Sequence, residues 1–170
     1  GPKPERNDVL FRKARDLAEK KEYRKAITIL DRLIDEAHSL TKCRALKAGI
    51  LINLKRREEA ALVCRDLLSK NPLCMEGHLL LGIIANSESD LFEAKRRFKN
   101  TLYIRSSNWL AHFYLGEIYR NTGEWELARR EYVIVINLLE KGGFEEHGLV
   151  IFPFSFTKDE IIRLCKQYVK

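Results

Sequence analysis

Residues 108–132 read NWLAHFYLGEIYRNTGEWELARREY, two apolar segments on either side of a turn at Thr122-Gly123. The alanine of the second segment, Ala128, recurs upstream at a constant spacing of 34 residues, as Ala94, Ala60 and Ala26. Each alanine has a small residue upstream in the same register and a large residue four positions downstream. These small and large residues are Ala14 and Leu30, Ala48 and Cys64, Gly82 and Phe98, and Gly116 and Tyr132. A fixed period of this length is typical of a solenoid of helical hairpins, which favours a binding scaffold over an enzyme.

Apolar residues at helical spacing predict helices throughout the chain. We expect them over 7–20, 24–37, 41–54, 57–70, 75–87, 91–104, 109–122 and 125–140. Turns are expected at Asn71-Pro72, at 87–90 and at Thr122-Gly123, and Gly142-Gly143 ends the last repeat helix. Thr157 and Glu160 form a capping-box pattern, which predicts a capping helix over 158–169. The expected fold is all-α, a right-handed solenoid of four helical hairpins with a C-terminal capping helix.

The four copies resemble the tetratricopeptide repeat, whose pattern includes Leu-Gly, Tyr, Ala-x3-Phe and a closing Pro. The residues that carry the resemblance are Leu115-Gly116, Tyr119, Ala128 and Tyr132; Leu81-Gly82, Ala85, Ala94 and Phe98; Ala48, Leu51, Ala60, Cys64 and Pro72; and Ala14, Leu17, Ala26 and Leu30. In this register the repeats span 7–141, divided as 7–40, 41–74, 75–108 and 109–142. Residues 1–6 are expected to be a linker that begins with a tag scar, Gly1-Pro2, 142–157 an apolar linker and 158–170 the capping helix.

About the last 45 residues also resemble the C-terminal repeat region of CheR-type chemotaxis receptor methyltransferases. The residues concerned are Ala128-Arg129-Arg130-Glu131-Tyr132 and Ser155-Phe156-Thr157, which opens a final Leu-rich helix. The resemblance implies a docking or regulatory region whose methyltransferase domain lies outside this chain. A free-standing adaptor is the alternative.

The tetratricopeptide resemblance implies that the first helix of each hairpin lines a concave groove. The partner-binding residues it implies are Phe11, Arg15, Gly49, Ile52, Asn53, Leu79, Ile83, Asn86, Phe113, Glu117, Arg120 and Asn121. Five of these are apolar, and we expect two of the five to belong to the core. The asparagines can hold a peptide backbone because an amide both donates and accepts hydrogen bonds. The predicted ligand is a short, partly hydrophobic peptide or an amphipathic helix.

Family members that bind chaperone tails use Lys and Asn at the positions of Phe11 and Arg15. The carboxylate clamp is therefore absent here, which argues against chaperone C-termini as ligands. Trp109, at a helix start near the groove edge, could contact a partner, and Trp125 is expected to pack over the last turn; a structural role is favoured for both.

The net charge is +7, and the basic excess is concentrated in 41–74, especially at Lys55-Arg56-Arg57. Lys95-Arg96-Arg97 and Arg129-Arg130 occupy equivalent places in the third and fourth repeats. This basic convex face supports an alternative function, the binding of nucleic acid or another acidic ligand. Glu93, Glu126 and Glu131 interrupt the ladder, so a solvated surface is the favoured interpretation.

No cofactor, metal or catalytic motif is predicted. The four histidines are scattered, and there is no glycine-rich phosphate loop. Cys74 and His78 share a helix face and could supply two zinc ligands, but no second pair follows at a fixed spacing. Four cysteines without a C-x-x-C pair favour a reducing, cytoplasmic location, and no apolar run approaches the ~18 residues of a membrane span. The apolar segment 148–156 is expected to pack on the fold, to fill a groove or to mediate self-association.

Overall fold

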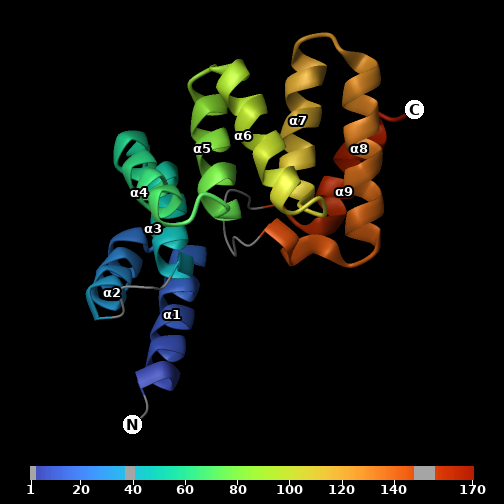
Figure 1. The fold of residues 1–170 in the computed structure, drawn as a ribbon. Helices are drawn as coiled ribbons and strands as arrows, with labels where there is room; N and C mark the ends of the chain where they lie inside the picture. The colour runs from blue at the N-terminus through green and yellow to red at the C-terminus, as the bar shows by residue number, and fades with distance from the viewer. Residues whose placement is uncertain (1–2, 37–40, 148–155) are drawn as a thin grey trace. The chain divides into compact units, whose positions relative to one another are not determined.

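A computed structural model describes residues 3–36, 41–147 and 156–170, which form α-helices and one 3-10 helix (Figure 1). The helices are α1 (Lys3–Glu19), α2 (Tyr23–Glu36), α3 (Thr41–Asn53), α4 (Arg57–Lys70), α5 (Met75–Ser87), α6 (Leu91–Ile104), α7 (Trp109–Asn121), α8 (Trp125–Glu140), η1 (Gly143–His147) and α9 (Lys158–Gln167). All the expected helices are present, and α1 begins four residues earlier than expected. The apolar segment 148–156 lies outside the described residues except for Phe156.

The chain divides into two compact units, whose described parts are 3–36 and 41–72 in the first and 73–147 and 156–170 in the second. The first unit consists of the hairpins α1–α2 and α3–α4. The second consists of the hairpins α5–α6 and α7–α8, together with η1 and α9 (Figure 1). Within the described residues, no helix is both long and apolar enough to cross a membrane.

Each hairpin of the second unit is joined by a small residue facing a large one. A Cβ atom built on Gly82 would lie 2.7 Å from Phe98 Cε1, and one on Gly116 would lie 3.0 Å from Tyr132 Cε1. The first unit places alanine at the equivalent positions, Ala14 and Ala48, opposite the smaller Leu30 and Cys64, and all four are fully buried. In the second unit, the residue pairs that set the sequence period are thus the contacts that close the hairpins.

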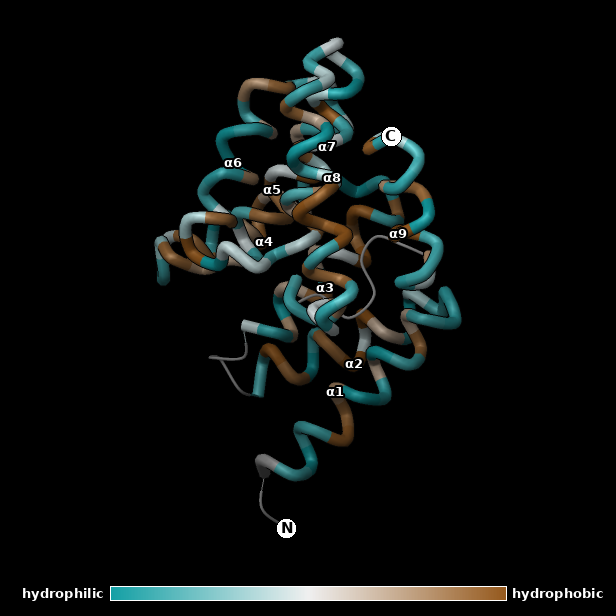
Figure 2. Tube along the Cα trace, turned by 90° about the vertical axis from the view of Figure 1, so that its right-hand side faces the viewer, coloured by the Kyte–Doolittle hydropathy of each residue, from teal (hydrophilic) through white to brown (hydrophobic). Residues whose placement is uncertain are grey.

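The first and second helices of the hairpin α5–α6 are buried differently. In α5, nine residues are buried, among them the uninterrupted run Leu79–Ala85. In α6 only Ala94, Phe98 and Thr101 are buried, a single stripe. A helix that is apolar all round is covered on several sides, whereas a helix with one apolar stripe has one side in water. The alternation of hydrophilic and hydrophobic residues is visible along α1 in Figure 2.

The turn inside every hairpin has the same geometry. Lys21, Lys55, Ser89 and Gly123, spaced at the repeat length, all have positive φ, between 61° and 78°. The next amide in each turn bonds to a carbonyl five residues earlier, as Glu22 N does to Leu17 O at 2.8 Å. This is the Schellman pattern of helix C-termini, which prefers glycine at the left-handed position. Only the fourth hairpin has glycine at this position, Gly123.

Capping side chains form hydrogen bonds at the starts of α6, α7 and α9. Asp90 accepts a hydrogen bond from Glu93 N and Asn108 from Ala111 N, at the starts of α6 and α7. The predicted capping box between Thr157 and Glu160 is formed at the start of α9. The chain leaves α8 through Gly142, whose φ is 89°.

Two elements cover the last hairpin. α9 packs on α8, and the ring of Tyr168, the residue after the last one of α9, stacks on Tyr132 with centroids 5.4 Å apart. η1, which the sequence analysis did not anticipate, packs on α7 and α8. Trp109 is the residue it covers: the indole Nε1 donates to Phe144 O at 2.7 Å, and the two rings stack at 5.5 Å.

Candidate partner-binding face

In the first unit, the predicted residues Phe11 and Arg15 lie on α1, and Phe11 contacts Lys42 of α3. The Lys42 ammonium lies 4.7 Å from the centroid of the Phe11 ring and 3.2 Å from Asp8 Oδ1. Among the described residues, the buried Arg15 Nε has no hydrogen-bond partner, and it lies 3.8 Å from Asp16 Oδ1. This face therefore presents an aromatic ring, paired charges and a guanidinium with unused donor capacity.

The apolar floor predicted for the groove is mostly core. The exposed fractions are 7% for Ile52, 0% for Leu79, 5% for Ile83 and 5% for Phe113, and only Phe11 is half-exposed. The expectation that two of these five residues belong to the core is wrong, because four do. Helical periodicity showed that each residue lies on an apolar side of its helix, but α3, α5 and α7 are apolar on more than one side. Gly49 is likewise buried.

The three predicted asparagines are accessible. Asn53, Asn86 and Asn121 stand at the last or last-but-one residue of α3, α5 and α7, the first two half-exposed and the third exposed. Their side-chain amides form no hydrogen bond with any part of the chain that the structure describes. Each amide therefore keeps two donors and one acceptor free for a ligand backbone.

Glu117 and Arg120, also predicted to bind a partner, are engaged within the second unit. Tyr132 Oη donates to Glu117 Oε1 at 2.6 Å, and the Arg120 guanidinium donates to Glu117 Oε2 at 2.7 Å and to Tyr132 Oη at 3.1 Å. The guanidinium also lies 4.5 Å from the ring centroid of Tyr168. Burial, and then the hydrogen bond to Glu117, raise the pKa of the Tyr132 phenol. Both side chains help to hold α9 on α7 and α8.

The two tryptophans differ: the structural role favoured for Trp109 is confirmed, and the one expected of Trp125 is not. Trp109 is 1% exposed, so a partner protein cannot reach it as a binding hot spot. His147 packs edge-on against the Trp109 ring, and its burial lowers the pKa of its imidazole to about 4. Trp125 is 63% exposed and does not pack over the turn as expected.

The basic residues of α6 and the pair Cys74 and His78 interact with neighbouring side chains. Glu93 forms ion pairs with both Arg96 and Arg97 at 2.8 Å, which reduces the positive charge of α6. His78 Nδ1 lies 3.1 Å from Arg97 Nη1, whereas Cys74 Sγ faces Glu76. Among the described residues, no group of three or more metal-ligating side chains comes together.

Comparisons with known proteins agree with this architecture. A family profile described as the tetratricopeptide repeat matches residues 8–37. MamA from Desulfovibrio magneticus RS-1, from residue 41 to its end, has 17% sequence identity and a TM-score of 0.62, with 80% of this chain and 77% of that one covered. The fold is that of tetratricopeptide-repeat proteins. A crystal structure of MamA with 14% identity covers 95% of this chain and 87% of its own length, at a TM-score of 0.60.

A third solved structure, MamA AMB-1, has 18% identity and a TM-score of 0.59, with 80% of each chain covered. At these identities the likeness concerns the tetratricopeptide fold alone. A comparison with curated proteins found no significant match. The resemblance of the C-terminal residues to chemotaxis methyltransferases has no support from these comparisons.

Proposed function

We propose that the chain is a non-catalytic interaction module that binds a peptide or helix of another protein along the first helices of its hairpins. The observation that carries the proposal is the pair of unused amides at Asn86 and Asn121, at corresponding ends of α5 and α7 in the second unit; Asn53 has the same place on α3 of the first unit. An extended peptide offers a carbonyl and an N–H at every residue, and an amide side chain can pair with both.

The ligand contacts proposed for the first unit are Phe11 and Arg15, in addition to Asn53. Arg15, whose side chain is 34% exposed, supplies a positive charge for a carboxylate of the ligand. Phe11 offers an apolar surface beside the Lys42 charge. The buried residues Ile52, Leu79, Ile83 and Phe113 then position the helices instead of touching the ligand.

The proposal treats 7–141 as four repeats in register and 158–170 as the cap of the last one. A cytoplasmic location belongs to the proposal as well, since all four cysteines are buried thiols, as in proteins of reducing compartments. Attachment to a chemotaxis methyltransferase rests only on the resemblance of 128–132 and 155–157. The nucleic-acid alternative is weaker because Glu93 neutralises part of the α6 cluster.

Affinity capture with matched variants tests the function. The Asn86→Ala/Asn121→Ala variant removes two amides from α5 and α7, and Asn100→Ala/Asn137→Ala removes two from the second helices α6 and α8 of the same unit. Proteins captured from a bacterial lysate by the wild type and the control pair, but not by the α5–α7 pair, support the proposal. Adding Asn53→Ala should deepen the loss. Identical capture by all variants contradicts it, provided that circular dichroism shows unchanged helix content.

A further inference from the structure

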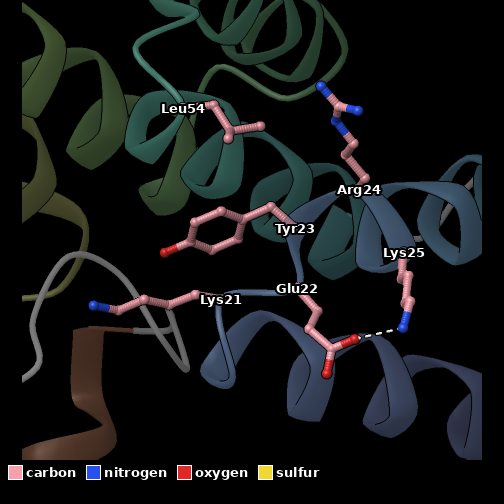
Figure 3. Close-up of a pocket in the computed structure, with 6 residues that line it drawn as sticks. All are labelled: Lys21, Glu22, Tyr23, Arg24, Lys25 and Leu54. Carbon is pink, nitrogen blue, oxygen red and sulfur yellow. Dashed lines mark hydrogen bonds and ion pairs between the residues drawn. The ribbon is translucent and has the colours of Figure 1, made fainter.

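The first unit carries a pocket at the turn between α1 and α2. Its volume is about 370 Å³, and it is lined by Lys21, Glu22, Tyr23, Arg24, Lys25 and Leu54. Tyr23 and Leu54 are half-buried and pack on the core cluster of this unit, so the apolar wall of the pocket is fixed. In Figure 3 the side chains of Lys21 and Tyr23 extend in the same direction, below Leu54.

The pocket has an excess of positive charge. Its lining includes three cationic side chains and one carboxylate, and that carboxylate, Glu22, is bound by Lys25 Nζ at 2.7 Å. The hydrogen bond and the charge of Lys25 lower the pKa of Glu22, so Glu22 stays ionised and occupied by Lys25. Lys21 and Arg24 form no ion pair with the parts of the chain that the structure describes. The side chains of Lys21 and Arg24 are therefore available to bind an anionic group of a ligand.

The next turn of the same unit extends this surface. Lys55 directly follows Leu54, is exposed and also lacks an ion pair among the described residues. Lys21 and Lys55 occupy the same repeat position, so they project from the same edge of the unit. Glu19 and Glu58 are also at these turns, and Arg56 is held by Glu59 at 2.7 Å. The unpaired charge at the pocket itself is therefore cationic.

Both lysines are held in a backbone conformation that disfavours them. Their φ values are 62° and 64°, the left-handed region in which a Cβ atom is strained. The equivalent turns of the third and fourth hairpins have Ser89 and Gly123, with φ 61° and 78°, so the turn itself does not need a lysine. The left-handed φ is common to all four turns, and this edge differs from the others in combining unpaired positive charge with an apolar pocket.

We infer that this edge of the first unit binds an acidic segment of another protein that carries an apolar side chain. The apolar side chain enters the pocket between Tyr23 and Leu54, and flanking carboxylates meet Lys21, Arg24 and Lys55. Single-stranded nucleic acid fits less well, because it needs successive exposed aromatic faces and the pocket offers only the half-buried ring of Tyr23. The inference goes beyond the proposed function, since the site lies at the turns and not along the first helices.

Fluorescence anisotropy on the full chain tests it with a labelled peptide in which one leucine is flanked by glutamates and aspartates. The decisive variant is Lys21→Gly/Lys55→Gly, which removes two charges and suits the left-handed turn, so its melting temperature should stay the same or rise. Its affinity should fall roughly fivefold, the effect of losing two exposed charge pairs. Lys99→Gln/Arg130→Gln, which removes two exposed cations of the second unit, should bind as the wild type does.

Four comparisons can overturn the inference. A peptide with amides in place of its carboxylates should bind more weakly, and unchanged affinity would show that the lysines and Arg24 do not bind carboxylates. A peptide with alanine in place of leucine should also bind more weakly, and unchanged affinity would show that the pocket does not bind the apolar side chain. Oligothymidylate binding more tightly than the acidic peptide would identify a nucleic-acid surface instead. Unchanged affinity of Lys21→Gly/Lys55→Gly would refute the assignment to this edge.

Discussion

The contact between Gly82 and Phe98 provides a quantitative test of how the hairpins are closed. In Gly82→Ala the new Cβ would lie 2.7 Å from Phe98 Cε1 and 2.8 Å from Cδ1. Carbon atoms in contact are about 3.5–4.0 Å apart, so the ring would have to move by roughly 1 Å. Phe98 is fully buried and stacks on Tyr114 with centroids 5.0 Å apart, which leaves it little room.

The expected cost follows from two opposed effects. Overpacking of a core costs about 1–3 kcal/mol of unfolding free energy. Alanine returns about 1 kcal/mol because its helix propensity exceeds that of glycine. We therefore expect Gly82→Ala to lower the stability of the second unit by about 1 kcal/mol. Gly116→Ala, whose Cβ would lie 3.0 Å from Tyr132 Cε1, should cost less because the neighbour must yield by only a few tenths of an ångström.

A double-mutant cycle separates the steric conflict from other effects. Phe98→Leu alone should cost about 1–2 kcal/mol through the lost ring and its stacking. In Gly82→Ala/Phe98→Leu the smaller side chain makes room, as Leu30 does opposite Ala14. The double variant should then be more stable than the sum of the single effects by about 1 kcal/mol.

Urea unfolding followed by tryptophan fluorescence is the assay. Both tryptophans, Trp109 and Trp125, are in the second unit with Gly82 and Phe98, so the signal reports that unit. A Gly82→Ala variant as stable as the wild type, or strictly additive effects in the cycle, would refute the steric explanation of the small-residue positions.

Three further predictions concern the elements that cover the last hairpin. Burial lowers the pKa of His147 to about 4, so the unfolded chain takes up a proton first as the pH falls. Stability should decline from about pH 6.5 to about pH 4, by at most about 3 kcal/mol, and His147→Gln should flatten the dependence in urea titrations. Tyr132→Phe leaves Glu117 and Arg120 without the hydroxyl and should cost about 1–2 kcal/mol. Thr157→Ala breaks the capping box of α9 and should cost about 1 kcal/mol, which Thr157→Ser should restore in thermal unfolding.

Matched controls make these outcomes decisive. Tyr103 on α6 is 87% exposed, so Tyr103→Phe should leave stability unchanged where Tyr132→Phe does not. A pH profile of His147→Gln identical to that of the wild type would show that another group governs acid sensitivity. Equal stability of Thr157→Ala and Thr157→Ser would show that the cap contributes nothing.

The candidate site was only partly predictable. The accessible asparagines Asn53, Asn86 and Asn121 follow from repeat position alone, because residues near the end of a helix reach solvent in every hairpin. Leu79 and Phe113 also occupy repeat positions that are expected to face the groove, but both side chains are buried in the core. Repeat position fixes the side of the helix on which a residue lies, and it does not reveal what packs against that side. The pocket at Lys21 was also missed; the signal available was the lysine at a turn position that the fourth hairpin fills with glycine.

The sequence by itself determined the helices, their turns and the pairing of small and bulky residues across each hairpin. These features depend on contacts within about 34 residues, and each leaves a local pattern in composition and spacing. Only the tertiary structure decided that η1 covers Trp109, that Tyr132, Glu117 and Arg120 join α9 to the last hairpin, and which apolar residues remain accessible. Those outcomes depend on segments that are distant in the sequence, and a helical period carries no information about which distant segment covers its second face.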